Sequence, residues 1–536
     1  MVEPASGVFF NGRVRTLDGA GRVVSAVAFA AGRIVALGDD DAVRRAAGGR
    51  GREVDLGGRT VVPGFIDPPV HMKEAFKYDR DLEQAVDKRD FLARLGKRCA
   101  ASNSKDWFVI SWSVNRRDQW PTANDLDSIS GDRPVFLSVG GHVYATNTLG
   151  LALSGIERDT PDPVGGRIER DPATGAPNGV LMDTARFLVL KKIDGGDRVT
   201  TSLEDRIAFS LGELARNGIT TAHDMVDSGD DIRAYQRLLR DGKLTACMHL
   251  LLRVWEGKIK LESVLELGLM AGFGGDLLKF GGVKASFDGQ FPSRGAYLSQ
   301  PYEETGGVGA PRIAPDQLTK MIVAAHAAGV RFCIHSIGDK ATTLVLDAFE
   351  EARRQRPDVH LRHRIEHAGN VLCSPEMIER MRVLEVTPVP NPSFLRSRGA
   401  LVGPWLGKMR GRRVVNVKDI MAGGAPIAVA SDWPGLRYLS PLVAIEALVT
   451  RRTADGIPIA ADQAIDAETA LRLYTVNNAY ASYEEDEKGT LELGKVADMV
   501  VLSDDPLSVA STAIGSIGIE VTVSRGRTVY ASAATR

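Results

Sequence analysis

Residues 314–339, APDQLTKMIVAAHAAGVRFCIHSIGD, form a helix-to-strand unit that decides the fold class. Pro315 and Asp316 are typical of a helix start, and Gly329 is typical of a helix end. Between them, apolar residues recur at the spacing of one helical face, at Leu318, Met321, Ile322 and Ala325. The run VRFCIH (330–335) that follows is apolar and β-prone, so it predicts a buried strand.

The same unit recurs through the middle of the chain. SLEDRIAFSLGELARNG (202–218) predicts a second helix, and ITTAHD (219–224) follows it directly as a strand candidate. Further strand candidates are LRHRIEHAG (361–369), LEVTPVP (384–390) and APIAVASD (425–432). Strands that alternate with helices indicate a parallel sheet, and about eight such units fit an α/β (β/α)8 TIM barrel. A doubly wound sheet is the alternative, but no GxGxxG follows an early strand.

The two ends of the chain have a different pattern. Residues 1–62 and 484–536 consist of short β-prone runs with turn signals, such as Asn11-Gly12. Because chain termini are often close in space, we expect both ends to build one composite β-sandwich beside a barrel of residues 63–483. Residues 75–200 follow neither the helical nor the strand periodicity and are rich in aromatic and turn residues. They therefore predict an insertion after the first barrel strand that covers the active-site mouth.

Composition excludes several classes of protein. The 536 residues are 44% hydrophobic and 25% charged, and 67 Lys and Arg balance 68 Asp and Glu to a net charge of −1. This balance argues against nucleic-acid and anionic-membrane partners. No apolar run approaches the ~18 residues of a transmembrane helix, and the first residues do not resemble a signal peptide. The four cysteines show no framework spacing, so we expect reduced thiols and a cytoplasmic protein.

Residues that bind metals lie where the predicted strands end. In a barrel these carboxyl ends share one face, where active sites are built. The candidates are His71, His223, Lys284, His335, His367 and Asp432. Histidines and a carboxylate that converge from several strands are the ligands a divalent metal such as zinc requires. A single histidine at a strand end is more often a packing residue, but repeated occurrence at matching positions favours a metal site.

Several motifs also resemble a known family. They are NGRVRTLD (11–18), PGFID (63–67), GGHVYATNTLGL (140–151), VKASFDGQFPSRGA (283–296), IHSIGD (334–339), RHRIEH (362–367), ASDWP (430–434) and KGTLELGKVADMVVL (488–502). In this order they resemble the YtcJ-like branch, family 3, of the amidohydrolase superfamily, nearly from end to end. The resemblance implies a (β/α)8 barrel, a small β-sandwich and one or two divalent metals, with zinc as the expected ion.

The resemblance also implies roles for individual residues. Lys284 would be carboxylated by CO2 and bridge the metals, since a buried lysine of lowered pKa can react and become an oxygen ligand. His335 and His367 would hold the more exposed metal. Asp432 would bind the buried metal and carry the proton from water to the leaving nitrogen.

The first predicted strand departs from the family pattern PGFIDxHxH. Here the chain has Asp67-Pro68-Pro69-Val70-His71, so His71 matches the second histidine and Pro69 replaces the first. Proline offers no ligand atom and no backbone N–H. Three interpretations remain open: a hydrolase with one metal held mainly by Lys284, His335 and His367; a non-hydrolytic lyase, isomerase or cyclase; or a catalytically silent protein that binds a ligand.

Four further residues are candidates for substrate binding. His142 lies in the predicted insertion, and Asp288 and Arg294 follow Lys284. For Asp288 and Arg294, an ion pair that fixes a loop is the alternative role. Trp433, beside Asp432, would shield the pocket from water. Together the sequence predicts a metal-dependent amidohydrolase that cleaves the C–N bond of a small amide, formamide or carbamate-type compound, and a homodimer is the oligomeric state we expect.

Overall fold

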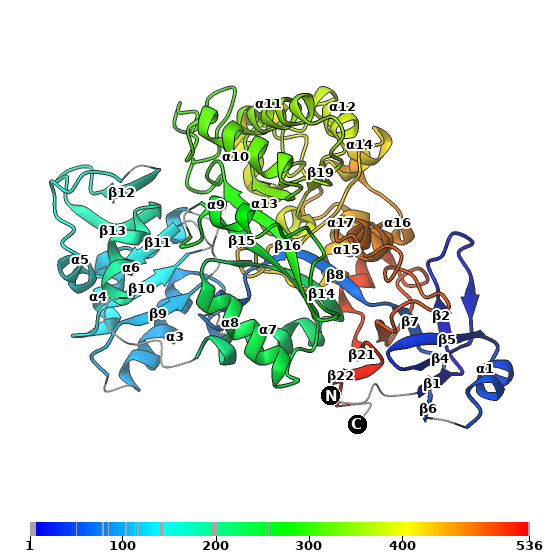
Figure 1. The fold of residues 1–536 in the computed structure, drawn as a ribbon. Helices are drawn as coiled ribbons and strands as arrows, with labels where there is room; N and C mark the ends of the chain where they lie inside the picture. Colours follow the sequence, from blue (N-terminus) through cyan, green and yellow to red (C-terminus); the bar gives the residue numbers. More distant parts are fainter. Residues whose placement is uncertain are drawn as a thin grey trace.

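A parallel sheet forms the centre of the computed structural model (Figure 1). The structure describes residues 7–49, 51–77, 80–83, 85–101, 104–112, 114, 117–139, 143–163, 165–194, 202–255 and 257–533. Within these ranges the sheet has the order β19-β18-β17-β16-β15-β14-β8, and all its neighbours are parallel. Its strands are β8 (Phe65–Val70), β14 (Ile219–Val226), β15 (Cys247–Arg253), β16 (Leu278–Ser286), β17 (Phe332–His335), β18 (Arg364–Glu366) and β19 (Thr387–Val389).

The eighth position of the barrel is joined to β19 by backbone hydrogen bonds and to β8 by a side chain. Ala428 donates its N–H to the carbonyl of Pro388 at 3.2 Å, which places this segment beside β19. On its other side, the Asn478 amide donates to the carbonyls of Ile66 (2.6 Å) and Val429 (2.8 Å), and accepts from the Val429 N–H at 2.9 Å. The expected strand at 425–432 therefore occupies the eighth place without a regular ladder, because Asn478 supplies the missing hydrogen bonds. The (β/α)8 fold is confirmed.

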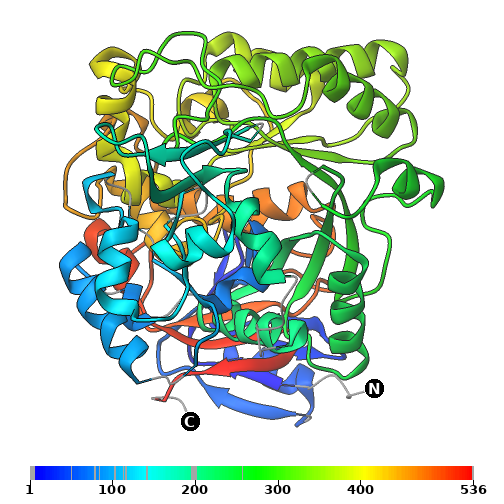
Figure 2. The same cartoon turned by 90° about the vertical axis from the view of Figure 1, so that its left-hand side faces the viewer.

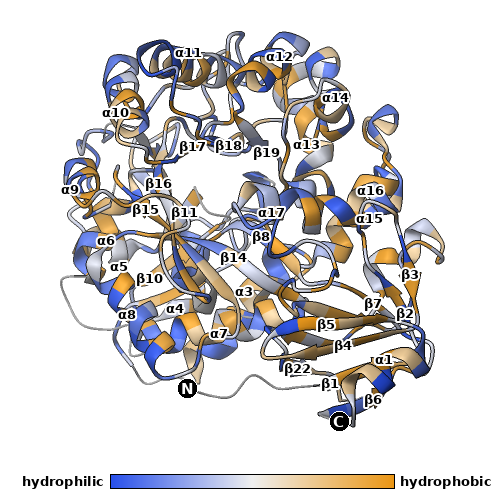
Figure 3. Cartoon of the chain, turned by 45° about the vertical axis from the view of Figure 1, so that its right-hand side comes forward, coloured by the Kyte–Doolittle hydropathy of each residue, from blue (hydrophilic) through white to orange (hydrophobic). Residues whose placement is uncertain are grey.

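Helices surround the barrel as the periodicity predicts. The helix expected from Leu203 begins there, and Ser202 caps it by accepting the Asp205 N–H at 3.1 Å. The helix expected at Pro315 also begins at that residue. Hydrophilic and hydrophobic residues alternate along the outer helices, as amphipathic packing requires (Figure 3). The helices are α7 (Leu203–Arg216), α8 (Gly229–Arg240), α9 (Leu261–Glu266), α10 (Pro315–Ala327), α11 (Asp339–Gln355), α12 (Pro375–Leu384), α13 (Pro392–Arg410), α14 (Val417–Ala422), α15 (Pro441–Thr450), α16 (Ala467–Arg472) and α17 (Asn478–Ala481), with η3 (Ala461–Gln463) and η4 (Leu473–Asn477) between them.

Both ends of the chain contribute to a pair of smaller sheets. One has the order β5-β4-β1-β6 and the other β22-β21-β20-β7-β2-β3, so β20 from the C-terminal end pairs with β7 from the N-terminal end. Apolar side chains of both ends share one core cluster, among them Phe9, Val27 and Met499. The elements are β1 (Gly7–Phe10), β2 (Arg13–Arg15), β3 (Val23–Val24), β4 (Ala26–Ala30), β5 (Arg33–Gly38), α1 (Asp40–Ala47), β6 (Arg52–Asp55), β7 (Thr60–Pro63), β20 (Met499–Leu502), η5 (Ser511–Ser516), β21 (Ile519–Ser524) and β22 (Arg527–Ala531). The domain boundaries at 62/63 and 483/484 stay a proposal.

The region expected as an insertion contains a fourth sheet with the order β12-β13-β11-β10-β9. Figure 2 shows it in front of the barrel, and apolar clusters line both of its faces. The irregular pattern of residues 75–200 thus conceals short strands and helices. These are η1 (Met72–Lys77), α2 (Arg80–Glu83), α3 (Lys88–Ala100), β9 (Phe108–Ser111), η2 (Arg117–Gln119), α4 (Ala123–Ser130), β10 (Val135–Ser138), β11 (Val143–Thr146), α5 (Thr148–Leu153), β12 (Gly166–Arg170), β13 (Pro177–Asp183) and α6 (Arg186–Asp194).

Two further expectations concern thiols and membranes. All four cysteines are buried and carry free thiols. Among the described residues, no helix combines the length and the apolar character needed to cross a bilayer.

Candidate active site

Five of the six metal-binding candidates gather at the carboxyl ends of the barrel strands. The sixth, His223, lies in the middle of β14, where its ring stacks on His249 and its Nε2 is 2.9 Å from the Ser482 hydroxyl. Lys284 lies near the end of β16, His335 ends β17, and His367 directly follows β18. His71 directly follows β8, and Asp432 follows the eighth barrel segment. Since these strands are parallel, their ends meet at one mouth of the barrel.

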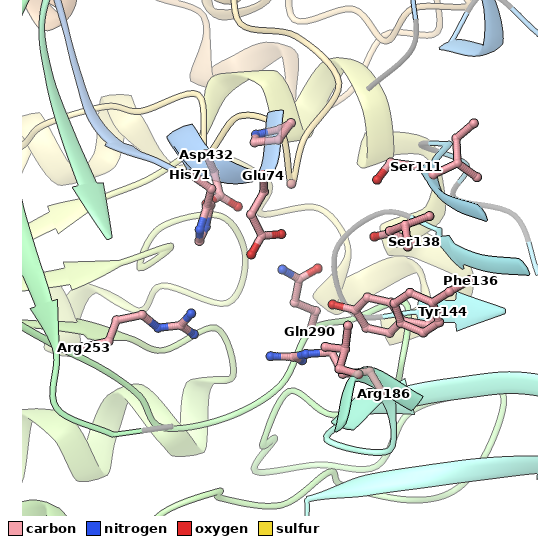
Figure 4. A pocket seen from close by; sticks show the side chains of 15 residues that line it. His71, Glu74, Ser111, Phe136, Ser138, Tyr144, Arg186, Arg253, Gln290 and Asp432 are labelled. Carbon is pink, nitrogen blue, oxygen red and sulfur yellow. The ribbon is translucent and has the colours of Figure 1, made fainter. Parts of the chain in front are cut away.

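His71 and Asp432 lie side by side at this mouth (Figure 4). The His71 Nε2 is 3.4 Å from Asp432 Oδ1, and the His71 N–H donates to the carbonyl of Trp433 at 2.8 Å. Burial raises the pKa of Asp432, but the hydrogen bond from His71 and the nearby charges of His367 and Lys284 outweigh this effect and lower the pKa to about 2. Asp432 is therefore ionised at neutral pH and suited to act as a metal ligand or base.

His335 and His367 face each other with ring centroids 4.5 Å apart. The His367 Nδ1 is 2.7 Å from the Asn391 Oδ1, which leaves the other ring nitrogen for a metal. Asn391 is itself fixed, because its Oδ1 also accepts from the Asn370 amide at 2.9 Å and its Nδ2 donates to the Ala430 carbonyl at 3.1 Å. No motif identified Asn391 beforehand.

The Lys284 side chain lies in surroundings that do not satisfy its amine. Its side chain is buried, and its Nζ has no hydrogen-bond partner among the residues that the structure describes. Burial lowers the pKa of Lys284 from 10.5 to about 8, although the charge of Glu366 opposes the shift. A buried amine without a partner is costly unless another group completes it. Together with two imidazoles and a carboxylate, Lys284 therefore fits the surroundings of a divalent metal, and its carboxylation stays a prediction.

The first barrel strand adds few ligand atoms to this set. Pro69 is buried within β8 and offers none. Asp67 is already engaged, because its carboxylate accepts the Ser431 N–H at 2.7 Å and the Ser431 hydroxyl at 2.5 Å. Burial raises the pKa of Asp67 to about 7 despite these bonds. His71 thus remains the candidate ligand from this strand end.

Asp288 is fully buried and holds a loop at the barrel mouth. Its carboxylate accepts the N–H groups of Ile337 (3.0 Å), Gly338 (2.9 Å) and Tyr297 (2.9 Å). Burial raises the pKa of Asp288 to about 7 although these three donors oppose it. Its Oδ1 is 3.9 Å from His335 Nε2, so Asp288 supports the loop after β17 and the adjacent imidazole.

The other three candidates for substrate binding have different positions. Arg294 forms an ion pair with Glu304 and donates to the carbonyls of its own loop, so the structure places it in a loop-fixing role. Trp433 is buried beside Asp432. His142 lies outside the described residues. Substrate contact by these side chains stays a prediction.

A pocket lies between the barrel mouth and the insertion (Figure 4). Several polar groups that sequence reasoning missed project into it. Among them, Arg253 ends the barrel strand β15, a position that could have identified it. The lining residues are His71, Glu74, Val109, Ile110, Ser111, Phe136, Ser138, Tyr144, Arg186, Leu190, Arg253, Gln290, Asp432, Pro434 and Gly435. The pocket therefore gives a small molecule access to His71 and Asp432.

A second group of possible ligands, Cys247, His249 and Glu484, lies at the start of β15, away from the mouth. Two ammonium groups already contact this carboxylate, because Lys279 Nζ is 2.7 Å and Lys488 Nζ 3.3 Å from Glu484 Oε1. His249 Nε2 lies 3.1 Å from the other oxygen. Neighbouring cations disfavour a metal ion, so this group is an ion-pair network.

The parallel barrel carries imidazole, amine and carboxylate groups at the carboxyl ends of its strands, and its similarity to known amidohydrolases identifies it as a hydrolase that acts on C–N bonds. A model of the amidohydrolase family matches residues 52–530, so the chain belongs to that family. The resemblance inferred from the motifs is thereby confirmed.

Individual relatives agree with this assignment. The chain is 30% identical over 522 residues to the N-substituted formamide deformylase of Arthrobacter pascens, covering 94% of both chains. It is 29% identical over 494 residues to the YtcJ protein of Bacillus subtilis (strain 168), covering 89% of this chain and 90% of that one. A solved structure of an uncharacterized metal-dependent hydrolase from Pyrococcus furiosus matches with a TM-score of 0.73 and 27% identity, covering 94% of this chain and 100% of that one.

Proposed function

We propose that the chain hydrolyses the C–N bond of a small amide, formamide or carbamate-type compound with one divalent metal, zinc being the expected ion. Lys284 as a carboxylated ligand, His335 and His367 would hold the metal, with Asp432 and His71 beside it. The observation that carries the proposal is the buried Lys284 amine, which has no hydrogen-bond partner among the described residues. The similarity to a formamide deformylase supports a formyl or acyl substrate.

When bound, the metal polarises the substrate carbonyl and lowers the pKa of the attacking water. The Asp432 carboxylate, ionised at neutral pH, accepts a proton from that water and passes it to the leaving nitrogen. His71, 3.4 Å from Asp432 Oδ1, orients this carboxylate. Asn391 orients the His367 ring. Amide and water thus give an acid and an amine.

A non-hydrolytic reaction is the alternative that Pro69 favours, because its strand supplies one imidazole fewer than the family pattern. Heavy-oxygen water separates the two reactions. Protein loaded with zinc and bicarbonate is given a panel of N-formyl, N-acetyl and N-carbamoyl compounds, and the products are analysed by mass spectrometry. For the N-formyl and N-acetyl compounds, hydrolysis must place one solvent oxygen in the formate or acetate. A product without solvent oxygen would contradict hydrolysis.

The Asp432→Asn variant tests the mechanism. We expect its turnover to fall by about 10²–10⁴-fold, because the base for the proton transfer is lost. Asp276→Asn is the matched control, since Asp276 is exposed and pairs with Arg525. Near-normal turnover by Asp432→Asn would remove Asp432 from the mechanism.

A small-molecule substrate, a cytoplasmic location and a homodimer belong to the same proposal. The free, buried thiols support a reducing compartment. The molar mass in solution measures the oligomeric state.

A further inference from the structure

The pocket contains a guanidinium group that forms an ion pair with none of the described acidic side chains. Arg186, the first residue of α6, lines the pocket, and its side chain projects into it (Figure 4). It donates to the carbonyl of Asp183 at 3.2 Å and lies over the rings of Tyr144 and Phe187. Within the described part of the chain, no carboxylate forms an ion pair with it. Its positive charge is therefore available to a molecule in the pocket.

A second arginine faces the same space from the barrel. Arg253 ends β15, level with Lys284 on the next strand, and its guanidinium points toward Arg186 across the pocket (Figure 4). Its charge is shared, because Arg253 Nη1 is 3.1 Å from Asp227 Oδ1 and Asp227 also pairs with Lys73. Arg253 thus adds hydrogen-bond donors to the pocket but little net charge.

The remaining charged groups of the pocket lie nearer the reacting end. Glu74 follows His71 by one turn and points into the pocket between the two arginines and His71 (Figure 4). Asp432 lies beside His71. The negative charges therefore border the candidate metal site, and the positive charge of Arg186 stands opposite them. This arrangement fits a molecule with one anionic end, whereas a polyanion would be repelled by Glu74.

We propose that the substrate is an amide that carries a carboxylate, as in an N-formyl or N-acyl amino acid, and that Arg186 binds this carboxylate. The inference rests on the proposed hydrolysis and adds the class of substrate. A guanidinium binds a planar carboxylate through two parallel N–H donors. The Tyr144 ring under Arg186 holds the guanidinium in place, so little flexibility is lost on binding. Arg186 is a specificity residue that touches the substrate away from the reacting carbonyl.

Matched pairs of substrates test the inference. Each pair consists of an N-formyl or N-acetyl amino acid and the same amide without its carboxylate, such as N-formylphenylalanine and N-formyl-2-phenylethylamine. The zinc- and bicarbonate-loaded protein should prefer the acid at least about 10-fold in kcat/KM, which is the typical contribution of a charged hydrogen bond. Arg186→Met should lower kcat/KM for the acid about 10–100-fold and change it less than about 3-fold for the neutral amide. Arg186→Lys should recover part of the loss.

The control is Lys192→Met, which removes an exposed charge from the same helix. This variant should leave kcat/KM unchanged for both the acid and the neutral amide. Equal rates for acid and neutral amide, or an equal loss for both in Arg186→Met, would overturn the inference.

Measurements of binding distinguish a failure of the proposed hydrolysis from a failure of the proposed carboxylate subsite. The affinity of the loaded protein for each acid and its neutral counterpart is measured by calorimetry, with and without Arg186→Met. If no amide is hydrolysed, the proposed hydrolysis fails, but acid binding that depends on Arg186 still supports a carboxylate subsite. Absence of such binding, with hydrolysis intact, overturns the subsite alone.

Discussion

Replacement of Lys284 by methionine should stabilise the metal-free protein. The Lys284 ammonium is buried without a hydrogen-bond partner among the described residues. The fall in its pKa from 10.5 to about 8 corresponds to about 3.5 kcal/mol at about 1.4 kcal/mol per pH unit. Methionine has a similar length and no charge to desolvate. The gain is smaller than this figure, because Glu366 loses a favourable neighbouring charge.

The stability difference between Lys284→Met and the wild type should depend on pH in a definite direction. Below about pH 8 the folded protein carries the buried ammonium, so the full difference between variant and wild type is present. Between pH 8 and 10.5 the unfolded chain binds more protons than the folded one, so wild-type stability rises with pH and the gap closes. If the whole chain unfolds together, a gain of about 3 kcal/mol raises the melting temperature by about 3 °C.

The assay is thermal unfolding in carbonate-free buffer with chelator, at a series of pH values. Lys488 provides the control, because it is an equally buried lysine that does have partners: Thr221 Oγ1 at 2.9 Å and Glu484 Oε1 at 3.3 Å. Lys488→Met should therefore destabilise the protein by about 3–5 kcal/mol. A Lys284→Met variant that melts below the wild type at pH 7 would refute the reasoning, since it would mean that the ammonium has a stabilising partner.

Three further substitutions test separate parts of the account. Asn391→Ala should weaken zinc affinity about 10–100-fold in a competition titration, because the His367 ring loses its orienting partner; unchanged affinity would exclude that role. Asn478→Ala should lower the free energy of unfolding by about 3 kcal/mol, since three hydrogen bonds that close the barrel are lost, and a loss below about 1 kcal/mol would contradict this closure. Asp505→Asn should destabilise by about 1–2 kcal/mol at pH 7 by breaking ion pairs to Arg13 and Arg15. Burial raises the pKa of Asp505, but the hydrogen bonds from Arg15 and Arg13 outweigh burial and lower the pKa. The difference in stability between Asp505→Asn and the wild type should therefore vanish as the pH falls below 3.8. A difference that stays constant with pH would contradict the role of these ion pairs.

The sequence was sufficient for the barrel and for the residues at its mouth. Helical periodicity ending at Gly329, followed by the apolar run to His335, is a local signal, and both elements form where the periodicity predicts them. The strand-end positions of Lys284 and His367 follow from the same rule. Their roles as metal ligands stay predictions.

Contacts between segments far apart in the sequence could not be predicted from local sequence patterns. The eighth barrel segment is held by Asn478, and no local pattern shows that an amide 49 residues away replaces a strand ladder. Arg186 reaches the pocket from the insertion, whose short strands have no sustained periodicity. Asn391 is a single polar residue whose importance depends on the position of His367. Arg294 forms an ion pair with Glu304, which the sequence alone could not show, and its contact with the substrate stays a prediction.

The most direct test is the metal content per chain, measured by elemental mass spectrometry after incubation with zinc and bicarbonate and removal of free metal. The account predicts about one divalent ion in the wild type, because Pro69 supplies no ligand, and almost none in Lys284→Met. Equal metal in both proteins would contradict the central role of Lys284. A wild type that binds no metal would contradict the metal-dependent mechanism itself.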